Sequence, residues 1–238
     1  ATRLYPLTEN TPKPLLPVAG VPMIEHVLAS SAAIGHIDRT LVVTNNKFAG
    51  HFQDWLAGYQ EAHPDFNGAI VNDGTTSNDD RLGAIGDLQL VLEQEAIDDD
   101  VLVIAGDNLF TGDLLGFGAC CRETNAPVLG LYDVGTREEA RKYGVVAVDD
   151  DDRLTSFEEK PEEPKSTLIG IALYYYPSTT LPEISRYIKE GNNPDQPGRL
   201  VQWLYPQQPV YTWAVPGDWL DIGSKETLEA ANALFAAR

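Results

Sequence analysis

Five prolines within the first 22 residues restrict what the start of this chain can form; they stand at positions 6, 12, 14, 17 and 22. Each proline fixes φ and removes a backbone donor, so the stretch ATRLYPLTENTPKPLLPVAGVPMI (1–24) cannot be a central strand, and its apolar residues lack helical spacing. A long ordered loop is therefore expected. It combines apolar side chains that favour burial with Arg3 and Lys13, so it either presents two cations to a ligand or carries two solvated charges, and composition alone favours neither.

Helical spacing and short apolar runs alternate along the chain after this loop. Alternation of this kind indicates an α/β fold with a parallel sheet and helices on both of its faces. The pattern predicts helices over 22–34, 48–62, 81–96 and 114–123 and strands over 39–44, 68–71, 100–105 and 127–132.

The pattern changes at residue 136. Three successive runs over 143–148, 154–159 and 167–176 are spaced like antiparallel strands, with a hairpin turn at residues 149–152. No internal repeat and no clean linker is present, so a single mixed domain over 1–238 is predicted. The remaining elements expected are a short helix over 136–142, helices over 181–189 and 199–205, a strand over 210–214 and a last helix capped by Ser224.

The chain is strongly acidic. Its 238 residues carry 36 Asp and Glu against 17 Lys and Arg, which gives a net charge of −19. Such a surface repels a polyanion, so a nucleic-acid partner is not expected. One hypothesis is adaptation to a salty cytoplasm, because concentrated counterions screen self-repulsion. In that case the free energy of unfolding should rise between low and molar KCl in denaturant titrations, and an unchanged value would contradict the hypothesis.

Apolar runs, cysteines and histidines give no sign of a membrane span or a zinc site. No run reaches the roughly eighteen apolar residues that a span needs, and no charged-then-apolar leader is present, so a cytoplasmic location without membrane contact is expected. The adjacent Cys120 and Cys121 lack further partners for a disulfide framework or a zinc site, and the four histidines lack metal-ligand spacing.

Two motifs in the opening stretch, Thr2–Thr8 and Thr11–Met23, resemble the signature of the sugar-1-phosphate nucleotidyltransferases. These enzymes make NDP-sugars from an NTP and a sugar 1-phosphate. The resemblance implies a Rossmann-like, mixed but mostly parallel sheet with helices on both faces and a small antiparallel sugar-binding subregion. It also implies that residues 1–132 mainly bind nucleotide and 133–238 mainly bind sugar. In that family a short strand and a glycine-rich turn precede the motif, so about ten native residues are expected to be missing here.

Two aspartates stand at predicted strand ends, Asp107 in AlaGlyAspAsn and Asp221 in TrpLeuAspIleGly. Ligands of open α/β sheets bind beyond the carboxyl ends of strands, and Mg²⁺ takes one or two carboxylates with phosphate oxygens and water. A single aspartate of this kind is more often a turn residue. Both, however, resemble the family's metal-binding aspartates. By the same resemblance Asp107 is catalytic, Lys13 stabilises the α-phosphate and Arg3 the leaving pyrophosphate.

The motif PheGluGluLysPro (157–161) resembles the family's sugar-phosphate clamp. The resemblance assigns Lys160 to the sugar phosphate and Glu159 to the sugar hydroxyls, with Gly144 and Gly170 lining the sugar pocket. An ammonium group is a suitable phosphate partner. Taken alone, the motif would be interpreted as an exposed charged hairpin.

The base-binding segment is the least regular part of the resemblance. Asn78 stands where the family has a base-reading glutamine, and Gly83 lies in the small-residue turn that follows. The helix expected after this turn should offer free backbone donors. Asparagine in place of glutamine leaves the choice of nucleotide open.

The function implied is Mg²⁺-dependent nucleotidyl transfer from an NTP to a sugar 1-phosphate, in a protein expected to be a homo-oligomer. One alternative is a cytidylyltransferase for a non-sugar phosphate such as phosphocholine or inositol phosphate. Another is an inactive relative with a regulatory role, because a fold does not guarantee an activity.

Overall fold

The computed structural model describes residues 4–77 and 79–237. Contacts divide the chain into two compact units, each built from separate stretches of sequence. Unit 1 consists of the described residues of 1–81, 106–114 and 217–238, and unit 2 consists of residues 82–105 and 115–216. The single domain over 1–238, with nucleotide binding mainly in 1–132 and sugar binding mainly in 133–238, stays a prediction. In the described ranges no helix is both long and apolar enough to cross a bilayer.

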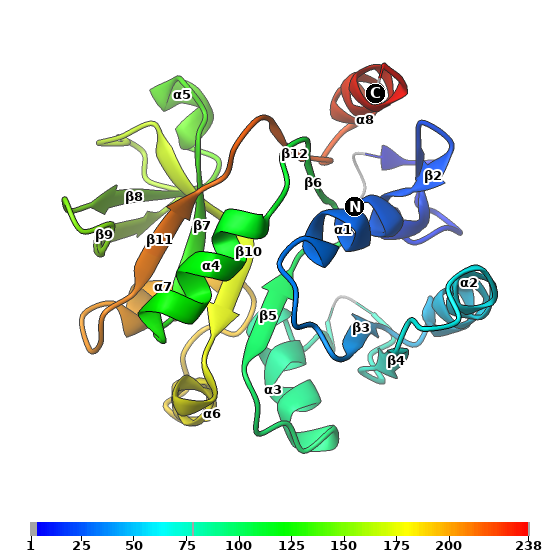
Figure 1. Cartoon of the computed structure of the whole chain (residues 1–238), viewed down its shortest axis with the longest axis horizontal. Helices are drawn as coiled ribbons and strands as arrows, with labels where there is room; N and C mark the ends of the chain where they lie inside the picture. Colours follow the sequence, from blue (N-terminus) through cyan, green and yellow to red (C-terminus); the bar gives the residue numbers. More distant parts are fainter. Residues whose placement is uncertain (1–3, 78, 238) are drawn as a thin grey trace. The chain divides into compact units, whose positions relative to one another are not determined.

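Unit 2 is organised around a six-stranded sheet with the order β11-β7-β10-β8-β9, in which β5 also pairs with β10 (Figure 1). Strands β5, β7, β8 and β11 run in one direction and β9 and β10 in the other. The prediction of a mixed, mostly parallel sheet is confirmed, although the central position of β10 makes most neighbouring pairs antiparallel. The strands are β5 (Val101–Ile104), β7 (Val128–Asp133), β8 (Gly144–Val148), β9 (Leu154–Glu159), β10 (Leu168–Tyr176) and β11 (Tyr211–Ala214).

Helices cover both faces of this sheet, as predicted. Alternate residues of a strand point to opposite faces, so Leu129 and Tyr174, which are register partners, share one face. They belong to the core packed by α3 (Ala84–Gln94), α6 (Leu181–Lys189) and α7 (Pro197–Leu204). On the other face Trp213 of β11 meets Phe117 of α4 edge to face, with 5.9 Å between ring centroids. Helix α4 spans Leu115–Thr124, and unit 2 is completed by α5 (Arg137–Ala140) and η3 (Ser178–Thr180).

The described residues of unit 1 combine three two-stranded sheets with three α-helices. Strands β3 and β4 pair in parallel, α2 packs on β4, β6 pairs with β12 in antiparallel register, and α1 packs on β6. Ser224 caps the last helix through its hydroxyl, as predicted, and Thr227 completes a reciprocal capping box. The elements are η2 (Lys13–Leu15), β1 (Pro17–Val18), β2 (Val21–Pro22), α1 (Met23–Ala32), β3 (Thr40–Thr44), α2 (Ala49–Ala62), β4 (Gly68–Asn72), β6 (Asn108–Phe110), β12 (Trp219–Asp221) and α8 (Lys225–Ala236).

The opening stretch is more regular than the expected loop. It contains the single turn η2 and a two-stranded ribbon, β1 and β2, that turns at Ala19 and Gly20, both with positive φ. The prolines are tolerated because each strand of the ribbon has only two residues. Leu4 and Val18 are fully buried, and Ala19 donates its N–H to Asn232 of α8 at 2.9 Å. The loop is therefore attached to the core of unit 1.

Candidate active site

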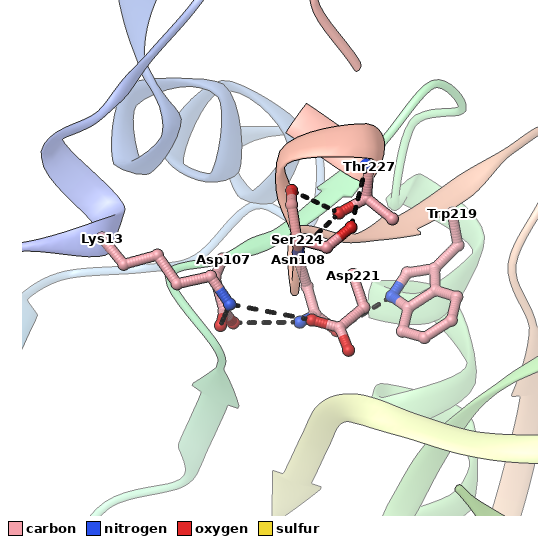
Figure 2. Close-up of polar contacts among 7 residues, drawn as sticks. All are labelled: Lys13, Asp107, Asn108, Trp219, Asp221, Ser224 and Thr227. Carbon is pink, nitrogen blue, oxygen red and sulfur yellow. Dashed lines mark hydrogen bonds and ion pairs between the residues drawn. The ribbon is translucent and has the colours of Figure 1, made fainter. Parts of the chain in front are cut away.

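Lys13, Asp107 and Asp221 meet in unit 1, although they come from three distant parts of the sequence (Figure 2). The Lys13 Nζ lies 2.5 Å from the Asp107 Oδ2 and 3.9 Å from the Asp221 Oδ1. The three side chains are 18%, 28% and 35% exposed respectively, so the cluster is open to solvent on one side. Two carboxylates share one ammonium group, which leaves the cluster with a formal charge of −1.

Backbone pairing brings the two carboxylates together. Asp107 directly precedes β6, and in the antiparallel β6–β12 pair Asp221 is the register partner of Asn108. The N–H of Ile222 donates to the Asp107 carbonyl oxygen at 3.1 Å, which extends the contact by one residue. The sequence predicted both aspartates at strand ends, but the strands that join them are only three residues long and were not predicted.

Close packing holds Lys13 next to Asp107. Pro14 lies against Gly106, where a Cβ atom would stand 3.1 Å from the Pro14 Cγ. A larger residue at 106 would therefore displace the turn η2 from the turn that carries Asp107. The proline-rich stretch thus packs directly against the residue that precedes Asp107.

Asn108 and Trp219 complete the cluster and were not identified from the sequence. Asn108 donates from Nδ2 to the Asp107 Oδ1 at 3.1 Å and accepts at Oδ1 from the Trp219 Nε1 at 2.8 Å. Both side chains are buried, with 4% and 8% exposure. Their positions in the sequence could have pointed to them, because Asn108 follows one of the predicted aspartates and Trp219 precedes the other by two residues.

The donor set of this cluster fits Mg²⁺, which is usually held by one or two carboxylates together with phosphate oxygens and water. Asp107 and Asp221 supply two carboxylates that already face one cation, the Lys13 ammonium. The described residues contain no group of three or more His, Cys, Asp or Glu side chains suited to a metal. A metal bound here would therefore need oxygens from a substrate or from water.

In unit 2, Gly170, Gly144 and Glu159 form one row across β10, β8 and β9. The glycines make room for the ring of Phe157, because a Cβ at Gly144 would stand 2.4 Å from the Phe157 Cζ and one at Gly170 would stand 3.3 Å from the Phe157 Cε2. Gly198 of α7 packs on the same ring. The two predicted pocket glycines therefore also have a packing reason to be glycine.

Glu159 and Lys160 have different surroundings although they are adjacent. Glu159 is half-buried, and burial raises its pKa, while the charges of Lys160 and Arg199 act in the opposite direction. Lys160 is exposed, has a positive φ of 49° and donates its backbone N–H to the Tyr143 carbonyl at 3.0 Å. Its side chain borders an open pocket that is also lined by Arg141, Pro161, Glu162 and Glu163.

The expectation of free backbone donors at the start of α3 is wrong for Ala84 and Ile85. The N–H of Ile85 donates to the Pro194 carbonyl at 2.8 Å and that of Ala84 to the Asp195 carbonyl at 3.4 Å. Gly83 has a φ of +80°, and a Cβ there would stand 2.6 Å from the Asp195 Cα. Carbonyl groups of a neighbouring loop in unit 2 thus accept hydrogen bonds from N–H groups that were expected to be free. Arg3 and Asn78, predicted for pyrophosphate and base, lie outside the described residues.

We expect Gly144→Ala to destabilise the protein by about 1–3 kcal/mol, because the new methyl group would overlap the buried Phe157 ring. Urea unfolding would measure the loss. Gly58→Ala is the matched control: Gly58 lies within α2 with nothing within 4 Å of its would-be Cβ, so alanine should stabilise the helix by roughly 0.5–1 kcal/mol. Equal stability of Gly144→Ala and wild type would show that the ring moves freely.

We expect Glu159→Gln to become more stable than wild type as the pH rises. Burial raises the pKa of Glu159 in the folded state, so the folded protein holds this proton more tightly than the unfolded chain. Wild type therefore loses stability as the pH rises from the unfolded pKa of about 4.3 through the higher folded value. Glutamine stays neutral throughout. The difference between variant and wild type in urea unfolding should grow over this interval, and a difference that does not change with pH would contradict the prediction.

Comparisons with known proteins identify the family of this chain. The family model described as "Nucleotidyl transferase" matches residues 1–238. The bifunctional protein GlmU of Methanocaldococcus jannaschii is 27% identical over 233 residues, which are 97% of this chain and 50% of that protein. A UTP–glucose-1-phosphate uridylyltransferase of Synechocystis sp. is 31% identical over 230 residues, 93% of this chain and 57% of that protein. The chain thus spans about half the length of these curated relatives.

A solved structure has a similar fold. It belongs to a Bacillus anthracis protein assigned as a glucose-1-phosphate thymidylyltransferase and crystallised with sucrose. The TM-score is 0.84 at 26% sequence identity, and the match covers 100% of this chain and 92% of the other. The resemblance drawn from the opening motifs is confirmed, and the chain belongs to the nucleotidyl transferase family, among the sugar-1-phosphate nucleotidyltransferases.

Proposed function

We propose that this protein transfers a nucleotidyl group from an NTP to a sugar 1-phosphate, giving an NDP-sugar and pyrophosphate. The observation that carries the proposal is the meeting of Lys13, Asp107 and Asp221 at one point of unit 1. An ion pair between Lys13 and Asp107 alone would be an ordinary structural feature. A second carboxylate that faces the same ammonium supports the assignment of a site that binds cations and phosphates.

The reaction needs positioning and charge rather than a covalent nucleophile. An oxygen of the sugar phosphate attacks the α-phosphorus of the NTP, a new P–O bond forms, and the bond to the β-phosphate oxygen breaks so that pyrophosphate leaves in line. Two anions must meet on a protein with a net charge of −19, so cations must be supplied locally. Lys13 is proposed to stabilise the α-phosphate, and Arg3 the leaving pyrophosphate.

Asp107 and Asp221 would hold Mg²⁺, for which their carboxylates are a suitable pair. The metal, when bound, neutralises phosphate charge and favours the in-line geometry. In the described structure the Lys13 ammonium is the cation between the two carboxylates. We infer that Asp107 and Asp221 bind the metal in the working enzyme. The Lys13 ammonium would then be free to pair with the α-phosphate.

The sugar phosphate is proposed to bind in unit 2. Lys160 offers an exposed ammonium beside an open pocket, and Glu159 offers a half-buried carboxylate that can accept hydrogen bonds from hydroxyl groups. Gly144 and Gly170 lie in the same row of the sheet as Glu159. For the base, Asn78 and Gly83 remain the proposed contacts. We further propose a cytoplasmic homo-oligomer that binds neither nucleic acid nor membranes.

The proposal is tested by a substrate matrix scored by pyrophosphate release and by detection of the product. ATP, CTP, GTP, UTP and dTTP would each be combined with a panel of sugar 1-phosphates in the presence of Mg²⁺, with phosphocholine and inositol phosphate as further acceptors. Turnover with a sugar 1-phosphate supports the proposal. Turnover only with CTP and a non-sugar phosphate would replace it with the cytidylyltransferase alternative. No turnover with any pair would favour an inactive relative.

A further inference from the structure

A short chain of buried hydrogen bonds ends on one oxygen of Asp107. Trp219 donates to the Asn108 Oδ1 at 2.8 Å, and Asn108 donates from Nδ2 to the Asp107 Oδ1 at 3.1 Å (Figure 2). The other oxygen of Asp107, Oδ2, faces the Lys13 ammonium at 2.5 Å. The two oxygens of this carboxylate therefore have separate partners, one inside the fold and one at the cation.

The indole N–H determines which way the Asn108 amide is turned. An indole can only donate a hydrogen bond, whereas an asparagine amide has one accepting end and one donating end. With the Trp219 Nε1 in place, the amide oxygen must face the indole, so the NH₂ group is the end that faces Asp107. The opposite orientation would bring two donors together and point the amide oxygen at a carboxylate. Because both side chains are buried, water cannot compensate for such a mismatch.

The same contact links the strand that carries Asp221 to the residue that follows Asp107. Trp219 and Asp221 are two residues apart on β12, so their side chains lie on one face of the strand. Asn108 is the register partner of Asp221 on β6. The indole of Trp219 thus reaches diagonally across the β6–β12 pair to the residue next to Asp107. This hydrogen bond connects β12, which carries Asp221, to Asn108, the first residue of β6 and the residue that follows Asp107.

We propose that Trp219 is a positioning residue that acts on Asp107 through Asn108. It holds the Asp107 Oδ1 in a hydrogen bond and leaves the Oδ2 as the single oxygen that faces the cation. The proposal rests on the proposed function only in taking that cation to be a divalent metal in the working enzyme. It concerns Trp219 and Asn108, neither of which belongs to the site predicted from the sequence.

The test replaces Trp219 with phenylalanine, which keeps an aromatic ring and removes the N–H. Mn²⁺ serves as the probe, and its affinity is measured by electron paramagnetic resonance on the protein alone and with NTP but no sugar phosphate. Loss of a hydrogen bond behind a metal ligand typically lowers metal affinity about 10- to 100-fold. We expect Trp219→Phe to weaken Mn²⁺ binding by about tenfold, and to lower kcat at fixed Mg²⁺ while leaving the KM of the sugar phosphate unchanged.

Trp55→Phe is the matched control. Trp55 also lies in unit 1 and donates its indole N–H to a carboxylate, the Glu25 Oε1, at 2.9 Å, but it has no contact with Asp107 in the described structure. It should bind Mn²⁺ as wild type does even if it loses a similar amount of thermal stability. A merely structural role of Trp219 would make the two variants behave alike.

The outcomes separate this inference from the proposed function. Unchanged Mn²⁺ affinity in Trp219→Phe overturns the positioning role, and so does a wild-type protein that binds no Mn²⁺ either alone or with NTP. A wild type that binds Mn²⁺ tightly, a variant that binds it weakly and no turnover with any substrate pair would preserve the positioning role and reject the proposed activity. Turnover with a sugar 1-phosphate, together with unchanged Mn²⁺ affinity in Trp219→Phe, would support the proposed activity and reject the positioning role.

Discussion

Asp107→Asn is expected to lower the rate of pyrophosphate release by at least about 10²- to 10³-fold, the usual effect of losing one preorganised charge. The substitution keeps the shape of the side chain and removes its negative charge. Asp107 is partly exposed, and its Oδ2 lies 2.5 Å from the Lys13 Nζ, so the variant loses the contact that organises the cluster without creating a cavity. Metal affinity should fall as well, because a neutral amide is a weaker ligand than a carboxylate for a hard divalent cation.

The measurement pairs turnover with circular dichroism and thermal unfolding, since the fold should survive. Asp218→Asn is the matched control. Asp218 lies three residues before Asp221, it is exposed, and its side chain contacts Thr111 rather than the cluster. The control should keep nearly full activity. Activity of Asp107→Asn close to that of wild type would refute the assignment of this site.

Lys13→Met is expected to change activity and metal binding in opposite directions. Turnover should fall by about 10²- to 10³-fold, because the ammonium that would stabilise the α-phosphate is lost. The affinity of the substrate-free protein for Mn²⁺ should rise. Lys13 neutralises part of the charge of Asp107 and Asp221, and without it two neighbouring carboxylates attract a divalent cation more strongly. Methionine keeps a similar length and removes the charge together with the N–H donors that contact Asp107.

Lys47→Met provides the control for Lys13→Met. Lys47 is also in unit 1, but its Nζ donates to the Glu9 carbonyl oxygen at 2.7 Å and contacts neither aspartate of the cluster. Its removal should leave both turnover and Mn²⁺ affinity unchanged. If Lys13→Met lost Mn²⁺ affinity together with turnover, Lys13 would be helping to organise the metal site rather than occupying it, and the proposed exchange of cations would be wrong.

Local elements were predictable where periodicity and capping agree with packing. Residues 154–159 and 181–189 form β9 and α6 with the bounds that the pattern indicated, and Ser224 caps α8 through a hydroxyl that accepts from the Thr227 N–H. In each case the signal lies within a few neighbouring residues. The start of α3 shows the limit of such local signals. The N–H groups of Ala84 and Ile85 donate to carbonyls more than a hundred positions away along the chain.

The sequence by itself determined the α/β class and the family, and it singled out Lys13, Asp107 and Asp221 as candidate site residues, because these inferences depend on periodicity and on short motifs. Only the tertiary structure decided that the three side chains meet and that Asn108 and Trp219 lie behind Asp107. The physical reason is the pairing of β6 with β12, two three-residue strands that have no stability of their own. Their register is decided by partners that lie more than a hundred residues apart, which no local pattern records.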